Sequence, residues 1–177
     1  MIDKLLLPKI QSFIRKHENE DPFQLSLKYK EVDGVPIRSI SEQVSGRQKA
    51  QSKLPRWFQT EHILYPPKLS MEQGSSQSTA EYKAKLVKGR EFIDLTGGAG
   101  VDSWALSQSF QKGNYVEQDQ YLAELAKSNF SALGKNNIRV HHTTAEEYLT
   151  SISEKVDCIY IDPARRDKNK NRVFQLE

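Results

Sequence analysis

Short apolar runs alternate with helical segments along the second half of the chain, from Phe92 onward. The apolar runs are FIDL (92–95), YVEQ (115–118), RVHHT (139–143) and DCIYI (157–161). Between the second and third runs, one helical face is formed by Leu122, Leu125, Ala126, Phe130 and Leu133, and Gly134 ends it. Strands that alternate with helices are typical of a parallel sheet with crossover helices, so residues 89–177 are predicted to have an α/β fold.

Residues 1–88 are predicted to form a mostly helical N-terminal domain. A first helical face is formed by Ile2, Leu6, Ile10, Phe13 and Ile14. Asp21-Pro22 looks like a helix cap followed by proline, whereas residues 23–29 alternate as a strand would, and we favour the helix. The other predicted elements are a turn at 32–36, a long basic helix at 37–54, a loop rich in aromatics at 57–70 and a helix that runs from a capping box at Ser78–Glu81 to about Val87.

Composition argues against membrane and metal proteins. No stretch approaches the roughly 18 consecutive apolar residues of a membrane span, and the start of the chain lacks a signal-peptide pattern. We therefore expect a cytoplasmic protein. The single cysteine, Cys158, allows neither an internal disulfide nor a Cys-based zinc site, and the four histidines lack the spacing of metal ligands.

Charge is unevenly distributed between the two halves of the chain. Residues 1–90 carry 16 Lys and Arg against 10 Asp and Glu, whereas residues 91–177 carry 10 against 13. The basic first half indicates either an anionic partner or a solvated basic surface, and the sequence leaves both open.

The segment FIDLTGGAG (92–100) places an acidic residue and three glycines directly after an apolar run. Ligands of open parallel sheets bind at the carboxyl ends of the strands, and glycines there let the backbone approach them. A dinucleotide-binding turn would have a third glycine after Gly98 and Gly100, where the sequence has Val101-Asp102-Ser103. A P-loop is excluded because no G-K-[ST] follows. The other pattern is an acid at the strand end followed by alternate glycines, which Asp94 to Gly100 match with Thr96 in place of the first glycine.

This turn resembles the first motif, D/E-x-G-x-G-x-G, of class I S-adenosylmethionine-dependent methyltransferases. The resemblance implies that the cofactor is held by Asp94, Thr96, Gly97, Gly98 and Gly100. A second acid in this fold binds the ribose hydroxyls, and Glu117 stands in its place, 17 residues beyond Gly100. The third motif normally supplies an acid to adenine. Here the matching positions are Thr144, Ala145 and Glu146, so the contact would come from Glu146 or from backbone groups.

A loop before the first strand, with Ser75, Ser76 and Thr79, corresponds to residues that similar enzymes place beside the methionine end of the cofactor. The alternative is plain capping of the following helix by Ser78 and Glu81.

The segment IDPARRD (161–167) resembles the fourth motif, D/N-P-P-[YFW], of methyltransferases that act on exocyclic amines. The resemblance implies that Asp162 and the carbonyl of Pro163 accept hydrogen bonds from the target amine. Since Ala164 and Arg165 replace the proline and the aromatic residue, another group must stack on the base. The candidates are Trp57, Phe58, Tyr65 and the guanidinium of Arg165, although Trp57 and Phe58 are also typical core residues. Arg165 and Arg166 are candidate phosphate contacts, with a solvated loop as the alternative.

Over nearly its whole length the chain resembles a bacterial family of class I methyltransferases whose longer members carry ferredoxin-like and THUMP-like RNA-binding modules. The segments that carry this resemblance are EQVSGRQKAQSKLPRWF, ILYPPKLSMEQGSSQSTAEYK, DLTGGAGVDSW and YIDPARRD. The resemblance implies an RNA substrate. It also implies a Rossmann-like sheet that continues with further strands, so the chain is expected to be truncated after the fourth strand.

The expected function is therefore S-adenosylmethionine-dependent methylation of an exocyclic amine of an RNA base. The alternatives are a non-catalytic RNA-binding module with a vestigial cofactor site and an NAD-dependent oxidoreductase. The sequence leaves open the RNA, the methylated atom, a protein substrate and the oligomeric state.

Overall fold

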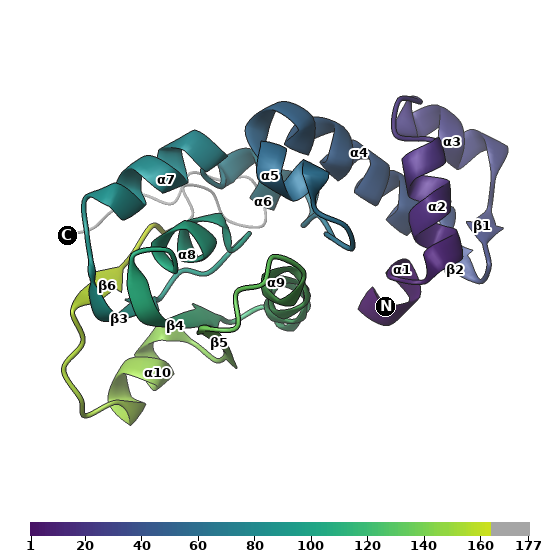
Figure 1. Cartoon of the computed structure of the whole chain (residues 1–177). Coiled ribbons are helices and arrows are strands. Elements are labelled where there is room, and N and C mark those ends of the chain that lie inside the picture. The colour runs from purple at the N-terminus through teal and green to yellow at the C-terminus, as the bar shows by residue number, and fades with distance from the viewer. Residues whose placement is uncertain (164–177) are drawn as a thin grey trace.

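The computed structural model describes residues 1–163, which form an elongated molecule with a helical half and a sheet half (Figure 1). The helical half contains α1 (Ile2–Leu5), α2 (Pro8–Lys16), α3 (Pro22–Lys28), β1 (Glu31–Val32), β2 (Val35–Pro36), α4 (Ile37–Lys53), α5 (Pro55–Gln59), α6 (Lys68–Gln73) and α7 (Gln77–Lys85). The sheet half contains β3 (Gly89–Asp94), α8 (Val101–Leu106), β4 (Phe110–Glu117), α9 (Gln120–Ala132), β5 (Ile138–His142), α10 (Ala145–Ser151) and β6 (Cys158–Tyr160).

The larger sheet is parallel and has the strand order β5-β4-β3-β6, which confirms the predicted α/β fold. Each predicted apolar run overlaps a strand of this sheet. The strand β4 begins at Phe110, well before the predicted start at Tyr115, because its first residues pair with β3 although several of them are polar and exposed. Backbone pairing along the ladder and the buried ring of Phe110 therefore set the beginning of this strand.

In the helical half, most of the predicted helices are present but their ends differ, and two further helices were not predicted. The helix after Asp21 is α3, and the Asp21 carboxylate accepts a hydrogen bond from the Phe23 amide at 2.8 Å. The first predicted helix is divided into α1 and α2, with Pro8 in the first turn of α2. The prediction of a loop at 57–70 was wrong at both of its ends, where α5 and α6 overlap it. The predicted capping box at Ser78 was wrong: α7 begins earlier, and its N-cap is Ser76.

Helices cover both faces of the sheet. The helices α7 and α8 lie over one face and α10 lies under the other (Figure 1). On the first face, Phe92 and Tyr115 of the strands share one core with Trp104 of α8 and Phe130 of α9. On the second face, Ile93 and its neighbours pack with Tyr148 of α10. This division follows from the alternation of side chains along each strand.

An extended segment at residues 63–65 joins the two halves. The side chain of Gln43 in α4 bonds both backbone groups of Tyr65, at 2.9 and 2.8 Å. The side chain of Asn129 in α9 bonds both backbone groups of Leu64, at 2.7 and 2.9 Å. The larger core contains residues from both sides of the predicted boundary near residue 88, so the halves share one interior. The boundary itself stays a prediction.

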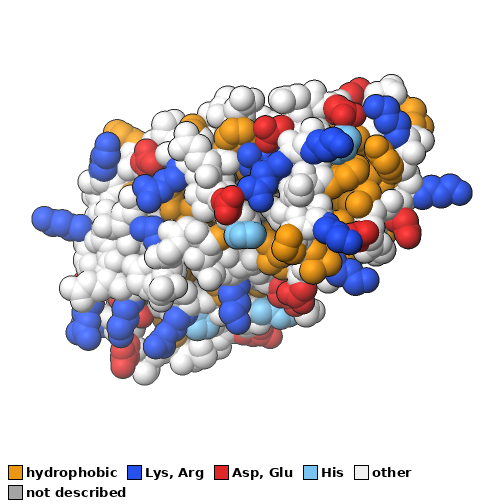
Figure 2. All heavy atoms as spheres, turned by 45° about the vertical axis from the view of Figure 1, so that its right-hand side comes forward, with side chains coloured by type: hydrophobic (Ala, Val, Ile, Leu, Met, Phe, Trp, Pro, Cys, Tyr) orange, Lys and Arg blue, Asp and Glu red, His pale blue; other side chains and the backbone are white. Residues whose placement is uncertain are grey.

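Much of the positive charge of the helical half is paired with acidic side chains. The pairs are Lys9–Asp33, Arg15–Glu61, Lys28–Glu20, Arg38–Glu42, Arg47–Glu18 and Lys49–Glu72. Figure 2 shows Lys and Arg side chains spread over this face, with Asp and Glu side chains beside several of them. On the face that Figure 2 shows, basic side chains are thus spread out rather than gathered in one patch. In the part of the chain that the structure describes, no helix is both long and apolar enough to span a membrane.

Candidate active site at the carboxyl edge of the sheet

The glycine turn follows β3 and lies against the end of β4. Gly98 and Gly100 have positive φ angles of 56° and 77°, a conformation that glycine adopts without strain. Gly97 is required for a different reason. A Cβ atom there would lie 2.5 Å from the Tyr115 ring and 2.8 Å from the Val116 carbonyl oxygen. The turn is therefore pressed directly onto β4, and this contact brings the ends of β3 and β4 together.

Asp94 lies beneath the turn and holds it in place. Its side chain is only 1% exposed, accepts a hydrogen bond from the Ser103 hydroxyl at 2.6 Å and accepts another from the Thr96 amide at 3.0 Å. Burial raises the pKa of Asp94 from 3.8 to about 6, although the bonds from Ser103 and Thr96 oppose this rise. The structure thus gives this predicted cofactor residue a supporting position, in which it orders the turn and the start of α8.

Glu117 ends β4 and contacts the glycine turn directly. Its two carboxylate oxygens accept hydrogen bonds from the amides of Gly98 and Asp119, each at 2.8 Å. A carboxylate has about four lone-pair sites, so each oxygen retains the capacity to accept a further bond from a ligand. The predicted ribose-binding residue therefore lies beside the turn with a fixed orientation and with acceptor capacity to spare.

The residues after β5 reach the same edge of the sheet. His142, the last residue of β5, pairs with Glu117, and the predicted adenine residues follow it. The Thr144 hydroxyl accepts a hydrogen bond from the Glu147 amide at 3.2 Å, and the Glu147 carboxylate accepts one from the Thr144 amide at 3.3 Å. These bonds form a capping box at the start of α10, which Ala145 and Glu146 begin. The Thr144 side chain is therefore engaged by its own helix.

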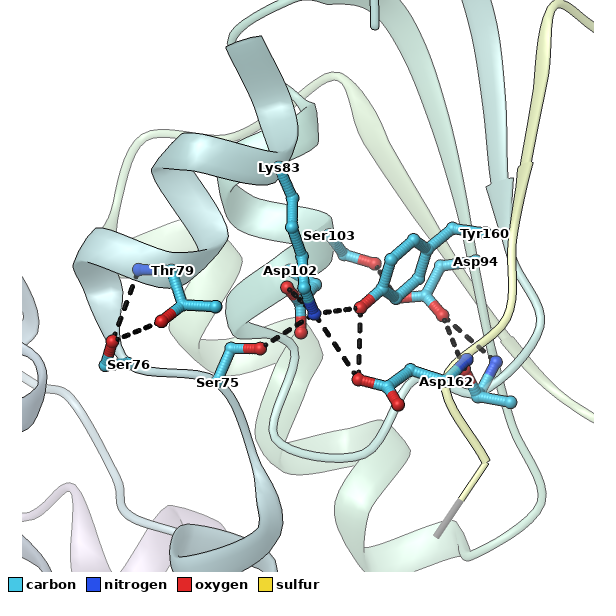
Figure 3. A network of polar contacts seen from close by, with 10 residues as sticks. Ser75, Ser76, Thr79, Lys83, Asp94, Asp102, Ser103, Tyr160 and Asp162 are labelled. Atoms are coloured by element: carbon cyan, nitrogen blue, oxygen red, sulfur yellow. Dashed lines mark hydrogen bonds and ion pairs between the residues drawn. The ribbon is translucent and has the colours of Figure 1, made fainter. Parts of the chain in front are cut away.

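The loop before α7 also approaches the turn. A Cβ atom on Gly74 would lie 3.5 Å from Ala99, so the loop and the glycine turn are in contact. Ser76 caps α7 and bonds the Thr79 hydroxyl at 2.8 Å, whereas the Ser75 hydroxyl accepts a bond from the Lys83 ammonium at 3.0 Å (Figure 3). Helix capping accounts for Ser76 and Thr79, whereas Ser75 contacts Lys83, and the loop meets the candidate cofactor turn at Gly74.

Asp162 joins the fourth motif to the same turn. Its backbone amide donates to the Thr96 hydroxyl oxygen at 2.8 Å, and Thr96 in turn donates to Asp94 at 3.4 Å. The threonine at this position, which departs from the glycine of the family motif, thus connects the glycine turn with Asp162. The Asp162 side chain is 50% exposed and accepts hydrogen bonds from the Tyr160 hydroxyl at 3.2 Å and the Lys83 ammonium at 3.4 Å (Figure 3).

Three residues of this edge were missed by sequence reasoning: Lys83, Asp102 and Tyr160. A signal for Tyr160 was present, because it lies two positions before Asp162 at the end of a predicted strand, and alternate residues of an extended segment share a face. Asp102 follows the glycine turn in α8, and Lys83 belongs to α7 in the helical half. Nothing in their local sequence indicated a contact with the fourth motif.

Two of the predicted base-stacking residues are buried in the protein interior, which corrects that part of the expectation. Trp57 is 0% exposed and meets Trp104 edge to face, and Tyr65 is 2% exposed. Gly46 of α4 lacks a Cβ atom, and Tyr65 packs directly against its backbone. Neither ring presents a face to a base, because core packing already covers it. The Cζ atom of Arg47 lies 4.2 Å from the centre of the Phe58 ring. Arg165 and Arg166 lie outside the described residues.

The candidate site therefore brings together the glycine turn, Glu117, the start of α10, the loop before α7 and Asp162 at one edge of a parallel sheet. Within residues 1–163, no cluster of three His, Cys, Asp or Glu residues could hold a metal ion. Cys158, the one cysteine, is partly buried in β6, and burial raises the pKa of its thiol.

Comparison with known structures identifies the class of fold. A crystal structure of a candidate methyltransferase from Porphyromonas gingivalis W83 is 28% identical and superposes with a TM-score of 0.75, over 93% of this chain and 41% of that chain. The parallel sheet, its covering helices and the glycine turn are thus those of a Rossmann-like methyltransferase fold.

The chain belongs to the family described as Conserved hypothetical protein 95, whose model matches residues 77–176. It is also similar to ribosomal RNA small subunit methyltransferase J of Francisella tularensis subsp. novicida and of Francisella philomiragia subsp. philomiragia, with 29% identity over 97 and 87 residues. These matches cover 50% and 45% of this chain and 39% and 36% of the relatives. The chain thus spans about two fifths of the length of the relatives that it matches.

Proposed function

We propose that the chain is the cofactor-binding half of an S-adenosylmethionine-dependent methyltransferase that modifies an exocyclic amine of an RNA base. One observation carries the proposal: the Thr96 hydroxyl connects the glycine turn to Asp162 through a 2.8 Å hydrogen bond. The candidate cofactor turn and the candidate catalytic acid are therefore neighbours. The similarity to ribosomal RNA methyltransferases supports the reaction class and the kind of substrate.

The residues at the sheet edge fit the cofactor chemically. A Cβ atom on Gly98 would meet only the Thr96 carbonyl oxygen, at 3.5 Å, so the backbone there is open to close approach by a ligand. Glu117 would accept hydrogen bonds from both ribose hydroxyls, as a carboxylate does well. Residues 144–146 would line the adenine, and Ser75, Ser76 and Thr79 would lie near the methionine end. When bound, S-adenosylmethionine would supply an activated methyl group.

Asp162 and the carbonyl of Pro163 would orient the target amine. Each would accept one hydrogen bond from the NH₂ group, and this would turn the nitrogen lone pair toward the methyl donor. After transfer the nitrogen would carry a positive charge and one proton too many, and the Asp162 carboxylate would accept that proton. The sulfonium is a good leaving group, so orientation would account for most of the rate enhancement. Guanine N2 and adenine N6 are the expected targets.

RNA is the proposed partner of the complete enzyme, and the cytoplasm is its proposed location. Arg165 and Arg166, which belong to the fourth-motif segment, would contact phosphates or stack on the base. The dispersed basic side chains of the helical half would add to the attraction of an anionic substrate. Ferredoxin-like and THUMP-like modules would belong to segments outside this chain.

Ala164-Arg165 replaces the usual proline and aromatic residue, and this departure favours one alternative function, a non-catalytic RNA-binding module. The methyltransferase and the binding module are distinguished by testing whether the longest natural polypeptide that contains the chain transfers labelled methyl groups from S-adenosylmethionine to total bacterial RNA. The enzyme should label RNA, and Asp162→Ala should lose about 100-fold in rate. RNA binding without any labelling by the wild type would refute the methyltransferase and favour the binding module.

A further inference from the structure

Lys83 lies at the centre of a polar network that touches the fourth motif (Figure 3). Its side chain extends from α7 toward β6. The Nζ atom contacts the Tyr160 hydroxyl at 2.5 Å, the Asp102 carboxylate at 3.2 Å and the Asp162 carboxylate at 3.4 Å. The Ser75 hydroxyl completes the set at 3.0 Å. A single ammonium group from the helical half therefore meets two carboxylates and two hydroxyls.

The network fixes the charge of Lys83. Burial would lower the pKa of Lys83, but the hydrogen bond with Tyr160 and the charge of Asp102 outweigh it and raise the pKa above its usual range. The side chain is 31% exposed, and Asp102 is 15% exposed. The ammonium thus stays charged at neutral pH and balances one of two carboxylates that would otherwise repel each other across a partly buried site.

The network also holds one carboxylate oxygen of Asp162 by hydrogen bonds and leaves the other oxygen able to accept one. Tyr160 and Lys83 both donate to Oδ2 of Asp162. Among residues 1–163, no side chain or amide bonds Oδ1. A carboxylate that is held through one oxygen has a defined orientation, and its second oxygen can accept a hydrogen bond from a substrate amine. This is the arrangement that orientation of an amine lone pair requires.

We propose that Lys83 is a positioning residue for methyl transfer, which acts on the substrate amine only through Asp162. It couples the helical half to the fourth motif, so the placement of α7 sets the direction of the Asp162 carboxylate. The proposal rests on the proposed methyltransferase function. A purely structural role, in which Lys83 only attaches α7 to β6, is the competing explanation.

The test compares Lys83→Met with Lys85→Met, a control on the same helix whose side chain is exposed. Both variants are made in the longest natural polypeptide that contains the chain, and methyl transfer to RNA is followed together with binding of S-adenosylhomocysteine. We expect Lys83→Met to lower kcat about 10-fold or more, with the dissociation constant of S-adenosylhomocysteine and the KM for RNA changed less than about 3-fold. Lys85→Met should match the wild type.

Three further variants separate positioning from structure. Lys83→Arg should recover part of kcat because it keeps the charge, and Tyr160→Phe should lower kcat about 5-fold by removing one donor to Asp162. In an Asp162→Ala background, Lys83→Met should cost little more, because a residue that acts through Asp162 has no effect once Asp162 is absent. Should Lys83→Met fail to fold, Tyr160→Phe and Lys83→Arg decide the question, since each preserves most of the network.

Two results would overturn the role of Lys83. One is a kcat within about 2-fold of the wild type in Lys83→Met and Tyr160→Phe. The other is a further full loss on adding Lys83→Met to Asp162→Ala, which would show an effect that does not pass through Asp162. Both require an active wild type, so they are distinct from the failure of the proposed function, in which the wild type itself transfers no methyl group.

Discussion

The buried carboxyl group of Asp94 should make the protein less stable as the pH rises from about 4 to 7. Its pKa is about 6 in the folded state, against an ordinary value of 3.8. The folded state therefore binds the proton more tightly than the unfolded state. The stability from this group is fully present below about pH 3.8 and is lost as the pH rises through about 6. The difference between the folded and the ordinary pKa corresponds to about 3 kcal/mol of stability. Solvent does not weaken this effect, because Asp94 is only 1% exposed.

The Asp94→Asn variant isolates this effect because it removes the titration and keeps the size of the side chain. The free energy of unfolding is measured in urea for both proteins between pH 4 and 7. Fluorescence of the buried Trp57 and Trp104 reports the transition. Groups other than Asp94 cancel in the difference between the proteins. The variant should gain about 3 kcal/mol relative to the wild type across this range. A flat difference, or one that falls with pH, would refute the reasoning.

Two other substitutions test the packing that positions the site. Gly97→Ala should cost about 3 kcal/mol of stability in urea denaturation, because the new Cβ atom would overlap Tyr115 and the Val116 carbonyl. Gly134→Ala should cost only about 1 kcal/mol, because Gly134 has open space around it and only its φ of 67° disfavours alanine. Equal costs would contradict the steric argument. Asn129→Ala should cost about 3 kcal/mol in the same assay because it leaves both backbone groups of Leu64 buried and unpaired, and a cost below about 1 kcal/mol would show that the joint between the halves does not depend on this residue.

The sequence predicted the sheet better than it predicted the helical half. Four apolar runs separated by helical segments permit few arrangements other than a parallel sheet, so the order of the elements followed from the pattern. In the helical half, the sequence predicted a cap at Ser78, whereas the N-cap of α7 is Ser76. The loop before α7 also contacts the glycine turn at Ala99, and the local sequence does not report a contact of this kind.

In the candidate site too, some residues were predictable from the sequence and others were not. The glycine turn, Glu117 and Asp162 follow strands of the sheet, so their common edge was predictable from the chain order. Lys83 was not, because it lies 79 residues before Asp162 and reaches it only through the packing of α7. Trp57 and Tyr65 were assigned to the substrate because large aromatic residues suit both a base platform and a core. Burial decides between these roles, and the sequence alone does not report burial.

The most direct test of the central claim is calorimetric binding of S-adenosylhomocysteine and NAD to the longest natural polypeptide that contains the chain. Glu117→Gln is the control, because glutamine keeps one oxygen acceptor for the Gly98 amide, loses the bond from the Asp119 amide and loses the charge that suits a ribose diol. The account predicts binding of S-adenosylhomocysteine in the micromolar range, at least about 10-fold weaker binding by the variant, and no binding of NAD. Selective binding of NAD, or no binding of S-adenosylhomocysteine, would contradict it.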